Sequence, residues 1–296
     1  MPAIKKRPLF LIAILVLLLW VWLSPPSSVP LSDHGGAAHS KAELKWLVNS
    51  PRFRARSVTN YLVQDDVPVL IEMLNDRRNW KDWGQLAWAL GFLDEGTEAQ
   101  HAIIHLIQRG DVWPWRERTR RKLVWLKISA VGLLDRTNGE IAHATARDAL
   151  TKSGALKLTQ EWIGRDLPGQ FKSNPERVVA LIRGHAALGL VWAQDEEGIE
   201  QVEKLFESVA PEATKQRQRQ LENSIAFFDL TLEEQALHEL YTGLVDALAT
   251  RDLIDDIGYD QFQKLSESDD HEVYMNAVFG YLDKYLEGYP FRLNAK

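Results

Sequence analysis

The residues best suited to binding chemistry lie in the segment 111–122, DVWPWRERTRRK, where tryptophan and arginine gather around a proline. Indole rings offer large rigid contact surfaces, guanidinium groups bind anions, and both residue types are enriched at binding hot spots. The segment therefore predicts an anion or peptide site on an otherwise acidic domain. The alternative is a buried tryptophan corner beside a solvated first helical turn. The candidate residues are Trp113, Trp115, Arg116, Arg118 and Arg121.

A second candidate region is the segment 151–175, TKSGALKLTQEWIGRDLPGQFKSNP, which interrupts a repeated helical pattern. Insertions in helical repeats are expected in loops on one face, and that face is often the binding face. Trp162 and Arg165 are its partner-binding candidates. The alternative is a plain surface elaboration without a ligand.

Residues that could support metal or catalytic chemistry give a weaker pattern. His101 and His105 stand one helical turn apart, but both project away from the apolar stripe of their segment and are expected to face solvent. The chain has no cysteine, which excludes disulfides and thiol catalysis. It also contains no phosphate-binding loop, GxSxG elbow or dinucleotide fingerprint. We therefore predict no catalytic residue, no metal site and no cofactor.

The elements that must position these residues are helices. Apolar residues recur at the helical spacing i, i+3, i+4 and i+7 in Val67, Leu70, Ile71 and Leu74. Residues 97–110 repeat this pattern, and Thr231 with Glu234 forms a possible capping box before another amphipathic run. Because strand-like alternation is nearly absent, the sequence predicts an all-α chain.

Short stretches rich in small residues recur along the chain. ALGFLDEG at 89–96 resembles AVGLLDRT at 130–137 at an interval of about 40 residues, and a looser copy, ALGLVWAQ, follows at 187–194. Close approach between inner helices of stacked hairpins would offset the helix-propensity cost of glycine, about 1 kcal/mol. The small residues expected at such contacts are Ala89, Gly91, Ala130, Gly132, Ala187 and Gly189.

The succession of VPVLIEMLND and LAWALGFLDEG resembles a HEAT repeat of the short bacterial type, related in pattern to phycobilin-lyase-like proteins. The resemblance is good over about 65–150 and weaker over 176–207. It implies a HEAT-like α-solenoid of helical hairpins that serves as a scaffold or binding surface, and it brings no catalytic residues. The segments 151–175 and 208–296 depart from the repeat pattern.

The N-terminus carries Lys5, Lys6 and Arg7 before an apolar run at 9–23, the layout of a signal anchor or a signal peptide. Trp20 and Trp22 resemble an interfacial aromatic belt, and the following SPPSS offers no clear cleavage site. These features favour a retained single-pass anchor, with cleaved export as the alternative. The positive-inside rule then leaves the tail in the cytoplasm and the rest in a bacterial periplasm.

The resulting organisation has four parts: a short tail and apolar anchor at 1–23, a flexible linker at 24–41, HEAT-like repeats at 42–207 with an insertion at about 151–175, and a helical C-terminal extension at 208–296. The net charge of −6 disfavours nucleic acid as a partner. We expect an inner-membrane scaffold or adaptor that binds another envelope protein without chemistry. The alternative is an envelope enzyme whose site combines 151–175 with the C-terminal helices.

Overall fold

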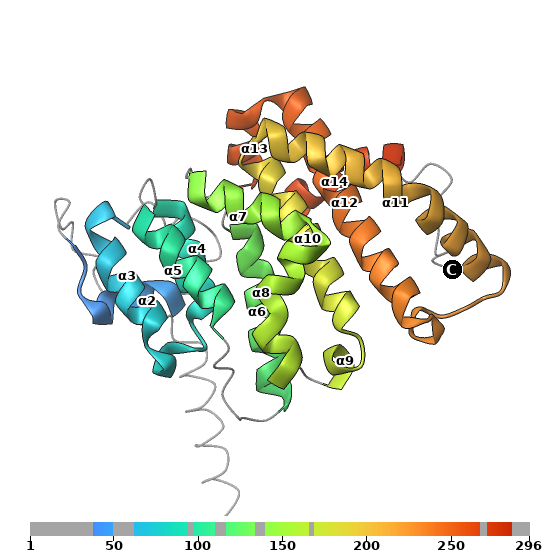
Figure 1. Cartoon of the computed structure of the whole chain (residues 1–296). Coiled ribbons are helices and arrows are strands. Elements are labelled where there is room, and N and C mark those ends of the chain that lie inside the picture. Colours follow the sequence, from blue (N-terminus) through green and yellow to red (C-terminus); the bar gives the residue numbers. More distant parts are fainter. Residues whose placement is uncertain are drawn as a thin grey trace, which may run out of the picture. The chain divides into compact units, whose positions relative to one another are not determined.

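The computed structural model describes residues 38–49, 62–93, 97–109, 117–133, 140–165, 169–266 and 271–285. Every regular element in these ranges is a helix, so the all-α prediction is confirmed (Figure 1). Within the same ranges, no helix combines the length and apolar character that a bilayer crossing requires. The predicted anchor at 1–23, and the predicted linker up to residue 37, lie outside the described residues.

The described elements are all α-helices or short 3-10 helices. The longest described helices are α11, with 27 residues, and α12, with 26. In chain order the elements are α2 (Lys41–Asn49), η3 (Gln64–Asp66), α3 (Val67–Asn75), η4 (Arg77–Asn79), α4 (Trp83–Leu93), α5 (Thr97–Gln108), α6 (Glu117–Leu133), α7 (Glu140–Leu150), α8 (Lys152–Arg165), α9 (Gly169–Lys172), α10 (Pro175–Trp192), α11 (Glu196–Glu222), η6 (Phe227–Asp229), α12 (Leu232–Ile257), α13 (Tyr259–Ser266) and α14 (His271–Tyr285).

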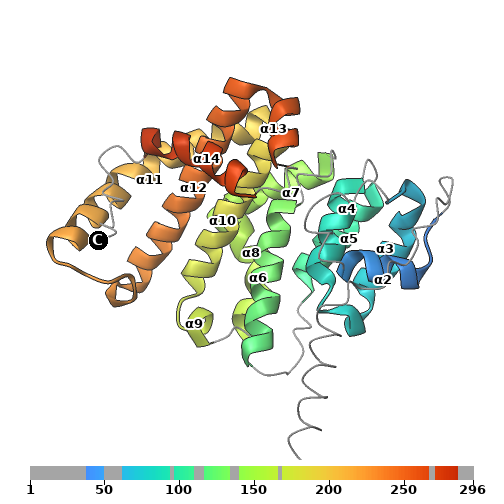
Figure 2. The same cartoon turned by 180° about the vertical axis from the view of Figure 1, so that it is seen from behind.

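Eight of these helices contact one another as two rows of four. In the first row, α3, α5, α7 and α11 each contact the next, and in the second row α4, α6, α10 and α12 do the same. Each first-row helix also packs against one second-row helix, giving the pairs α3 with α4, α5 with α6, α7 with α10, and α11 with α12 (Figure 1 and Figure 2). Apolar side chains are therefore buried both within a pair and between neighbouring pairs.

The apolar stripes predicted from the sequence form the buried faces of these helices. In α5 the stripe residues Ala99, Ala102, Ile103 and Leu106 are buried. On the opposite side of the helix, His101 and His105 are exposed, as predicted. Packing of the buried face against neighbouring helices therefore stabilises this amphipathic helix.

Basic side chains bind the C-terminal carbonyls of two first-row helices. Lys127 of α6, almost fully buried, donates from Nζ to the carbonyl of Arg109, the residue that follows α5. Arg183 of α10 donates from Nε to the carbonyl of Leu150 at the end of α7, over 2.7 Å. These carbonyls have no partner within their own helix and carry the negative end of its dipole. A cation from the partner helix satisfies both needs.

The predicted small-residue contacts are present at Gly132, and a tighter contact occurs where none was predicted. A Cβ added to Gly132 of α6 would lie 3.4 Å from the carbonyl oxygen of His185 in α10. Gly184 of α10 and Gly243 of α12 face each other, and a Cβ added to Gly243 would lie 2.6 Å from the Cα of Gly184. The second-row helices α10 and α12 therefore touch backbone to backbone.

The predicted insertion at 151–175 is mostly helical, so the expectation of a loop is wrong for Lys152–Arg165. Thr151 accepts the backbone N–H of Gly154 over 2.9 Å, which caps the first turn of α8. Ala155 and Leu158 are buried, and α8 packs against α5, α7 and α10. Gly154, which reads as a helix breaker, instead allows a tight junction, because a Cβ there would collide with the backbone of Asp148.

The folded part begins earlier than the predicted boundary at Ala42. His39 is buried, and it donates its backbone N–H to Asp66 over 2.7 Å while its ring nitrogen Nδ1 lies 2.9 Å from the same carboxylate. Ser40 and Glu43 exchange hydrogen bonds as a capping box at the start of α2. Residues 39–41, assigned to the linker from composition, are thus fixed to η3 and α2.

Candidate functional site

The partner-binding residues predicted in 111–122 are only partly within the described structure. Trp113, Trp115 and Arg116 lie outside the described residues. Arg118 lies in the first turn of α6, but its side chain is outside the description, whereas Arg121 is exposed on the same helix. The structure therefore places one of these candidates on a surface and leaves the anion or peptide site a prediction.

The candidates in 151–175 lie on α8. The backbones of Trp162 and Arg165 belong to its last turns, and their side chains are outside the description. Beyond α8, Phe171 of α9 is fully buried and meets Trp125 of α6 edge to face, with ring centroids 5.7 Å apart. At this position the aromatic residues form packing contacts rather than an open platform.

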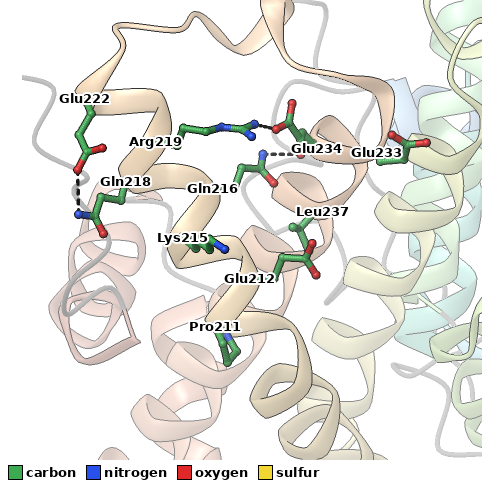
Figure 3. Close-up of a pocket in the computed structure, with 10 residues that line it drawn as sticks. All are labelled: Pro211, Glu212, Lys215, Gln216, Gln218, Arg219, Glu222, Glu233, Glu234 and Leu237. Carbon is green, nitrogen blue, oxygen red and sulfur yellow. Dashed lines mark hydrogen bonds and ion pairs between the residues drawn. The ribbon is translucent and has the colours of Figure 1, made fainter.

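A groove between α11 and α12 is a candidate site in the described part of the chain (Figure 3). We call it the α11–α12 groove. Its volume is about 900 Å³, which lies in the range of ligand sites. Its lining residues are Pro211, Glu212, Lys215, Gln216, Gln218, Arg219 and Glu222 from α11, and Glu233, Glu234 and Leu237 from α12.

Local sequence signals begin each of the two helices. Asp195 accepts the backbone N–H of Gly198 over 3.3 Å and caps α11. Thr231 and Glu234 form the predicted capping box of α12, with Glu234 accepting the Thr231 N–H over 2.8 Å. Pro211 lies inside α11 and cannot donate the helical hydrogen bond to the carbonyl four residues earlier. The groove begins at this proline and extends toward the C-terminal end of α11.

A hydrophobic cluster supports one end of the groove. Its fully buried members are Ala213 of α11 with Tyr241 and Val245 of α12, and the groove residue Leu237 packs against them. Tyr241 stacks with Phe206 at a centroid separation of 5.8 Å and donates its hydroxyl to the Tyr285 carbonyl over 2.9 Å. Burial raises the pKa of the Tyr241 phenol, so this hydroxyl remains a donor at neutral pH. The cluster fixes α11, α12 and the end of α14 to one another.

Gln216 links the two walls of the groove and leaves one acceptor unused. Its Nε2 donates to the backbone carbonyl of Glu234 over 2.8 Å, which fixes the amide orientation because a carbonyl only accepts. Its Oε1 is buried and has no hydrogen-bond partner among the residues that the structure describes. Figure 3 shows this oxygen on the side away from Glu234, between the two helices. A buried acceptor without a donor is costly, and a donor entering the groove would satisfy it.

The charges of the groove are mainly negative. Glu234 forms an ion pair with Arg219 across the groove, and Glu222 accepts a hydrogen bond from Gln218 over 2.9 Å. Among the described residues, the carboxylates of Glu212 and Glu233 have neither a hydrogen bond nor an ion pair. Four carboxylates against Lys215 and Arg219 give the lining a formal charge of −2.

A second charged cluster joins α12 to α14. Arg251 forms ion pairs with Asp252 and with Glu203 of α11, and Asp252 also accepts hydrogen bonds from Lys284 and Tyr285. Although burial favours the neutral form of Asp252, these three donors outweigh it and hold the pKa of its carboxyl below the ordinary value. Because these groups satisfy one another, we assign the cluster to the packing of α14.

The lining of the groove suits recognition more than reaction. Its ten described residues include no serine, cysteine, histidine or tyrosine, and only Pro211 and Leu237 are apolar. Small-molecule sites have a few placed polar groups, whereas eight of the ten residues of this lining are polar or charged. Charged and amide side chains along two long helices are suited to the side chains and backbone of a peptide segment.

Sequence reasoning did not identify the groove residues as a site. The Thr231 and Glu234 capping box was recognisable, but it indicates only where α12 begins. Gln216, the feature that most suggests a ligand, belongs to the polar run KQRQRQ, which is typical of a solvated helix face. Its burial arises only because α12 covers it, and that contact is not visible in the local sequence.

Comparison of the chain with family models, with curated proteins and with solved structures gives no match. The HEAT-like assignment therefore stays a prediction from the residues that carry the resemblance.

Proposed function

We propose that this protein is a membrane-anchored envelope scaffold or adaptor, a HEAT-like α-solenoid that binds another envelope protein through its helical-repeat surface and performs no chemistry. The proposed contact region is the α11–α12 groove. The partner-binding candidates of 111–122 and of α8 are proposed as additional contact residues.

The contact pattern of the helices supports the solenoid part of this proposal. Successive pairs contact the next pair along both rows, which is how hairpins stack in repeat proteins. The neighbouring helices α10 and α12 also run in the same direction. Arg177 meets Glu239 near their N-terminal ends, and Gly184 meets Gly243 further along both helices.

The membrane-anchored part rests on the sequence. The basic residues before the apolar run at 9–23, and the tryptophans at its far end, are the features of a retained signal anchor. An inner-membrane location would place residues 38–296 in the periplasm, where an envelope partner is accessible.

The observation that carries the binding role is the lining of the groove. The lining of a space of about 900 Å³ includes the carboxylates of Glu212 and Glu233 and the buried amide oxygen of Gln216, none of which pairs with another described residue. The alternative of an enzyme requires groups from 151–175 and from the C-terminal helices around one pocket. In the described chain α8 packs on α5, α7 and α10, whereas the groove is lined by α11 and α12. This arrangement favours a partner site.

Site-specific photocrosslinking in living cells tests the proposal. A photoreactive amino acid replaces Gln218 in the groove and, as the matched control, the exposed Gln64 of η3. The proposal predicts one discrete adduct to another envelope protein from position 218 and none of the same mass from position 64. Equal adduct patterns at both positions, or no adduct at 218, would contradict it.

A further inference from the structure

Gln216 and the two unpaired glutamates determine what kind of segment the groove can hold. All three present acceptors: Oε1 of Gln216, buried at the floor between the two helices, and the exposed carboxylates of Glu212 on α11 and Glu233 on α12. Gln216 is only 8% exposed, and its Oε1 is buried without a hydrogen-bond partner among the described residues. A complementary ligand must therefore supply donors and positive charge.

We propose that the α11–α12 groove binds a basic segment of the partner protein, in which lysine or arginine side chains pair with Glu212 and Glu233. This inference rests on the proposed function and specifies the chemistry of its partner. A backbone or side-chain N–H of the segment donates to Oε1 of Gln216. An apolar side chain of the segment packs against Leu237, which the hydrophobic cluster holds in place.

Charge complementarity favours this occupant over an acidic or neutral one. An acidic segment would bring its carboxylates close to four others and would leave Glu212 and Glu233 unpaired in a less hydrated space. Arg219 does not reverse this preference, because it is already paired with Glu234. Lys215 is then one positive charge against the three remaining glutamates of the lining. Attraction between a basic segment and the groove should weaken as ionic strength rises.

Peptide binding to the full-length chain in nonionic detergent tests the proposal. The probe is a fluorescein-labelled peptide of about ten residues with lysines and one leucine among glycines and serines, and the matched probes carry glutamate or glutamine in place of lysine. Fluorescence anisotropy is expected to show binding of the lysine peptide and no binding of the other two. Equal affinity for the three peptides would overturn the proposal.

Matched charge reversals test whether the peptide binds in the groove or is attracted only by the overall negative charge of the protein. The double variant E212K/E233K should weaken lysine-peptide binding by roughly tenfold. The control E196K/E207K changes two exposed glutamates, one in the first turn of α11 and one further along it, and makes the same change in net charge. It should leave affinity nearly unchanged. Equal losses in both variants would show that binding is not located in the groove.

A substitution at the floor and two at the C-terminus test the remaining contacts. Gln216→Met removes the unpaired acceptor together with the Nε2 hydrogen bond to Glu234 and should weaken binding by roughly threefold, while an unchanged affinity would contradict the contact with Oε1. The double variant R292Q/K296Q should leave affinity unchanged. If it instead strengthens peptide binding, the chain's own C-terminal segment is the occupant and the proposal is overturned.

Peptide binding and crosslinking at position 218 together distinguish a wrong partner chemistry from a wrong scaffold role. If the lysine peptide does not bind but position 218 still crosslinks to an envelope protein, the scaffold role stands and the basic partner is excluded. If the lysine peptide binds but position 218 gives no adduct in cells, the groove has the proposed chemistry and the scaffold role is contradicted. Light scattering that shows self-association disrupted by E212K/E233K would identify a second copy as the occupant and overturn the proposal.

Discussion

Gly184 and Gly243 lie on different helices, almost sixty residues apart in sequence, and their backbones are in direct contact. A Cβ added at Gly243 would lie 2.6 Å from the Cα of Gly184, and one added at Gly184 would lie 3.1 Å from the Cα of Gly243. Real Cβ atoms do not approach other heavy atoms as closely as the first of these distances. The contact sets the spacing between α10 and α12, and α12 forms one wall of the groove.

Gly243→Ala should therefore destabilise the protein. The added methyl group forces α10 and α12 apart at a cost of about 1–3 kcal/mol, which exceeds the roughly 1 kcal/mol gained from helix propensity. Urea unfolding of the full-length chain, followed by circular dichroism, measures the change. Gly280→Ala is the matched control because a Cβ there meets nothing within 4 Å, so it should stabilise α14 slightly. Equal effects of the two substitutions would contradict the close contact.

The ion pair between Arg177 and Glu239 should contribute to stability because it is largely shielded from water. Its side chains are 16% and 17% exposed, with Nε and Nη2 of Arg177 at 2.8 and 2.5 Å from Oε1 of Glu239. Glu239→Gln leaves the arginine charge without its counterion and should cost about 2 kcal/mol in urea unfolding. Glu200→Gln breaks the exposed pair with Lys204 and should give no detectable change. If Glu239→Gln did not change the free energy of unfolding, solvent would screen the Arg177–Glu239 pair as well.

Two half-buried histidines, His185 and His238, should make stability depend on pH. Burial lowers the pKa of His185, and burial, aided by the nearby Arg217 and Arg177, lowers that of His238. In the unfolded chain both histidines titrate near pH 6.5. Because their pKa values are lower in the folded state, the unfolded state binds more protons than the folded state just below pH 6.5. Their contribution to stability is therefore complete above about pH 7 and is lost as pH falls through 6.5.

Urea unfolding of the wild type and of the double variant H185Q/H238Q at pH 7.5 and pH 5.5 measures this effect. The wild type should lose more unfolding free energy between the two pH values than the variant. The control H101Q/H105Q, which changes two exposed histidines of α5, should retain the wild-type loss. If H185Q/H238Q loses as much as the wild type, other groups cause the pH dependence.

The sequence identified the helices more reliably than their contacts. The stripe that includes Ala99 and Ile103, and the capping box of Thr231 with Glu234, depend on residues within one or two turns of each other, so a local pattern contains the information. The contact of Gly184 with Gly243 depends on which helices become neighbours. Gly184 also lies outside the recurring small-residue pattern that pointed to Gly132 and Gly189.

The prediction of a loop at 151–175 was wrong for a local reason. The loop was expected because insertions in helical repeats usually lie in loops, but Thr151 supplies the N-cap that allows a helix to begin there. The groove could not be predicted for a different reason, since its floor exists only because Gln216 of α11 is covered by α12. Residues of this kind are identified once the neighbouring helix is known.

The tryptophan and arginine segment at 111–122 remains a prediction with its own test. The variant W113A/W115A/R118Q/R121Q should abolish partner recovery in crosslinking pull-downs with little change in the thermal melt. If the four substitutions unfold the domain, the tryptophans belong to a core, as in the alternative interpretation. The variant R118Q/R121Q retains both tryptophans and tests the arginines separately, because a folded chain with unchanged recovery would exclude them as contacts.

We propose that the α11–α12 groove holds the partner protein. The most direct measurement is the yield of the adduct from a photoreactive residue at position 218 in cells that express the chain with E212K/E233K or with E196K/E207K. We predict that the adduct is lost in the first background and retained in the second, at equal protein levels and equal thermal melts. Retention of the adduct in both backgrounds would contradict the claim.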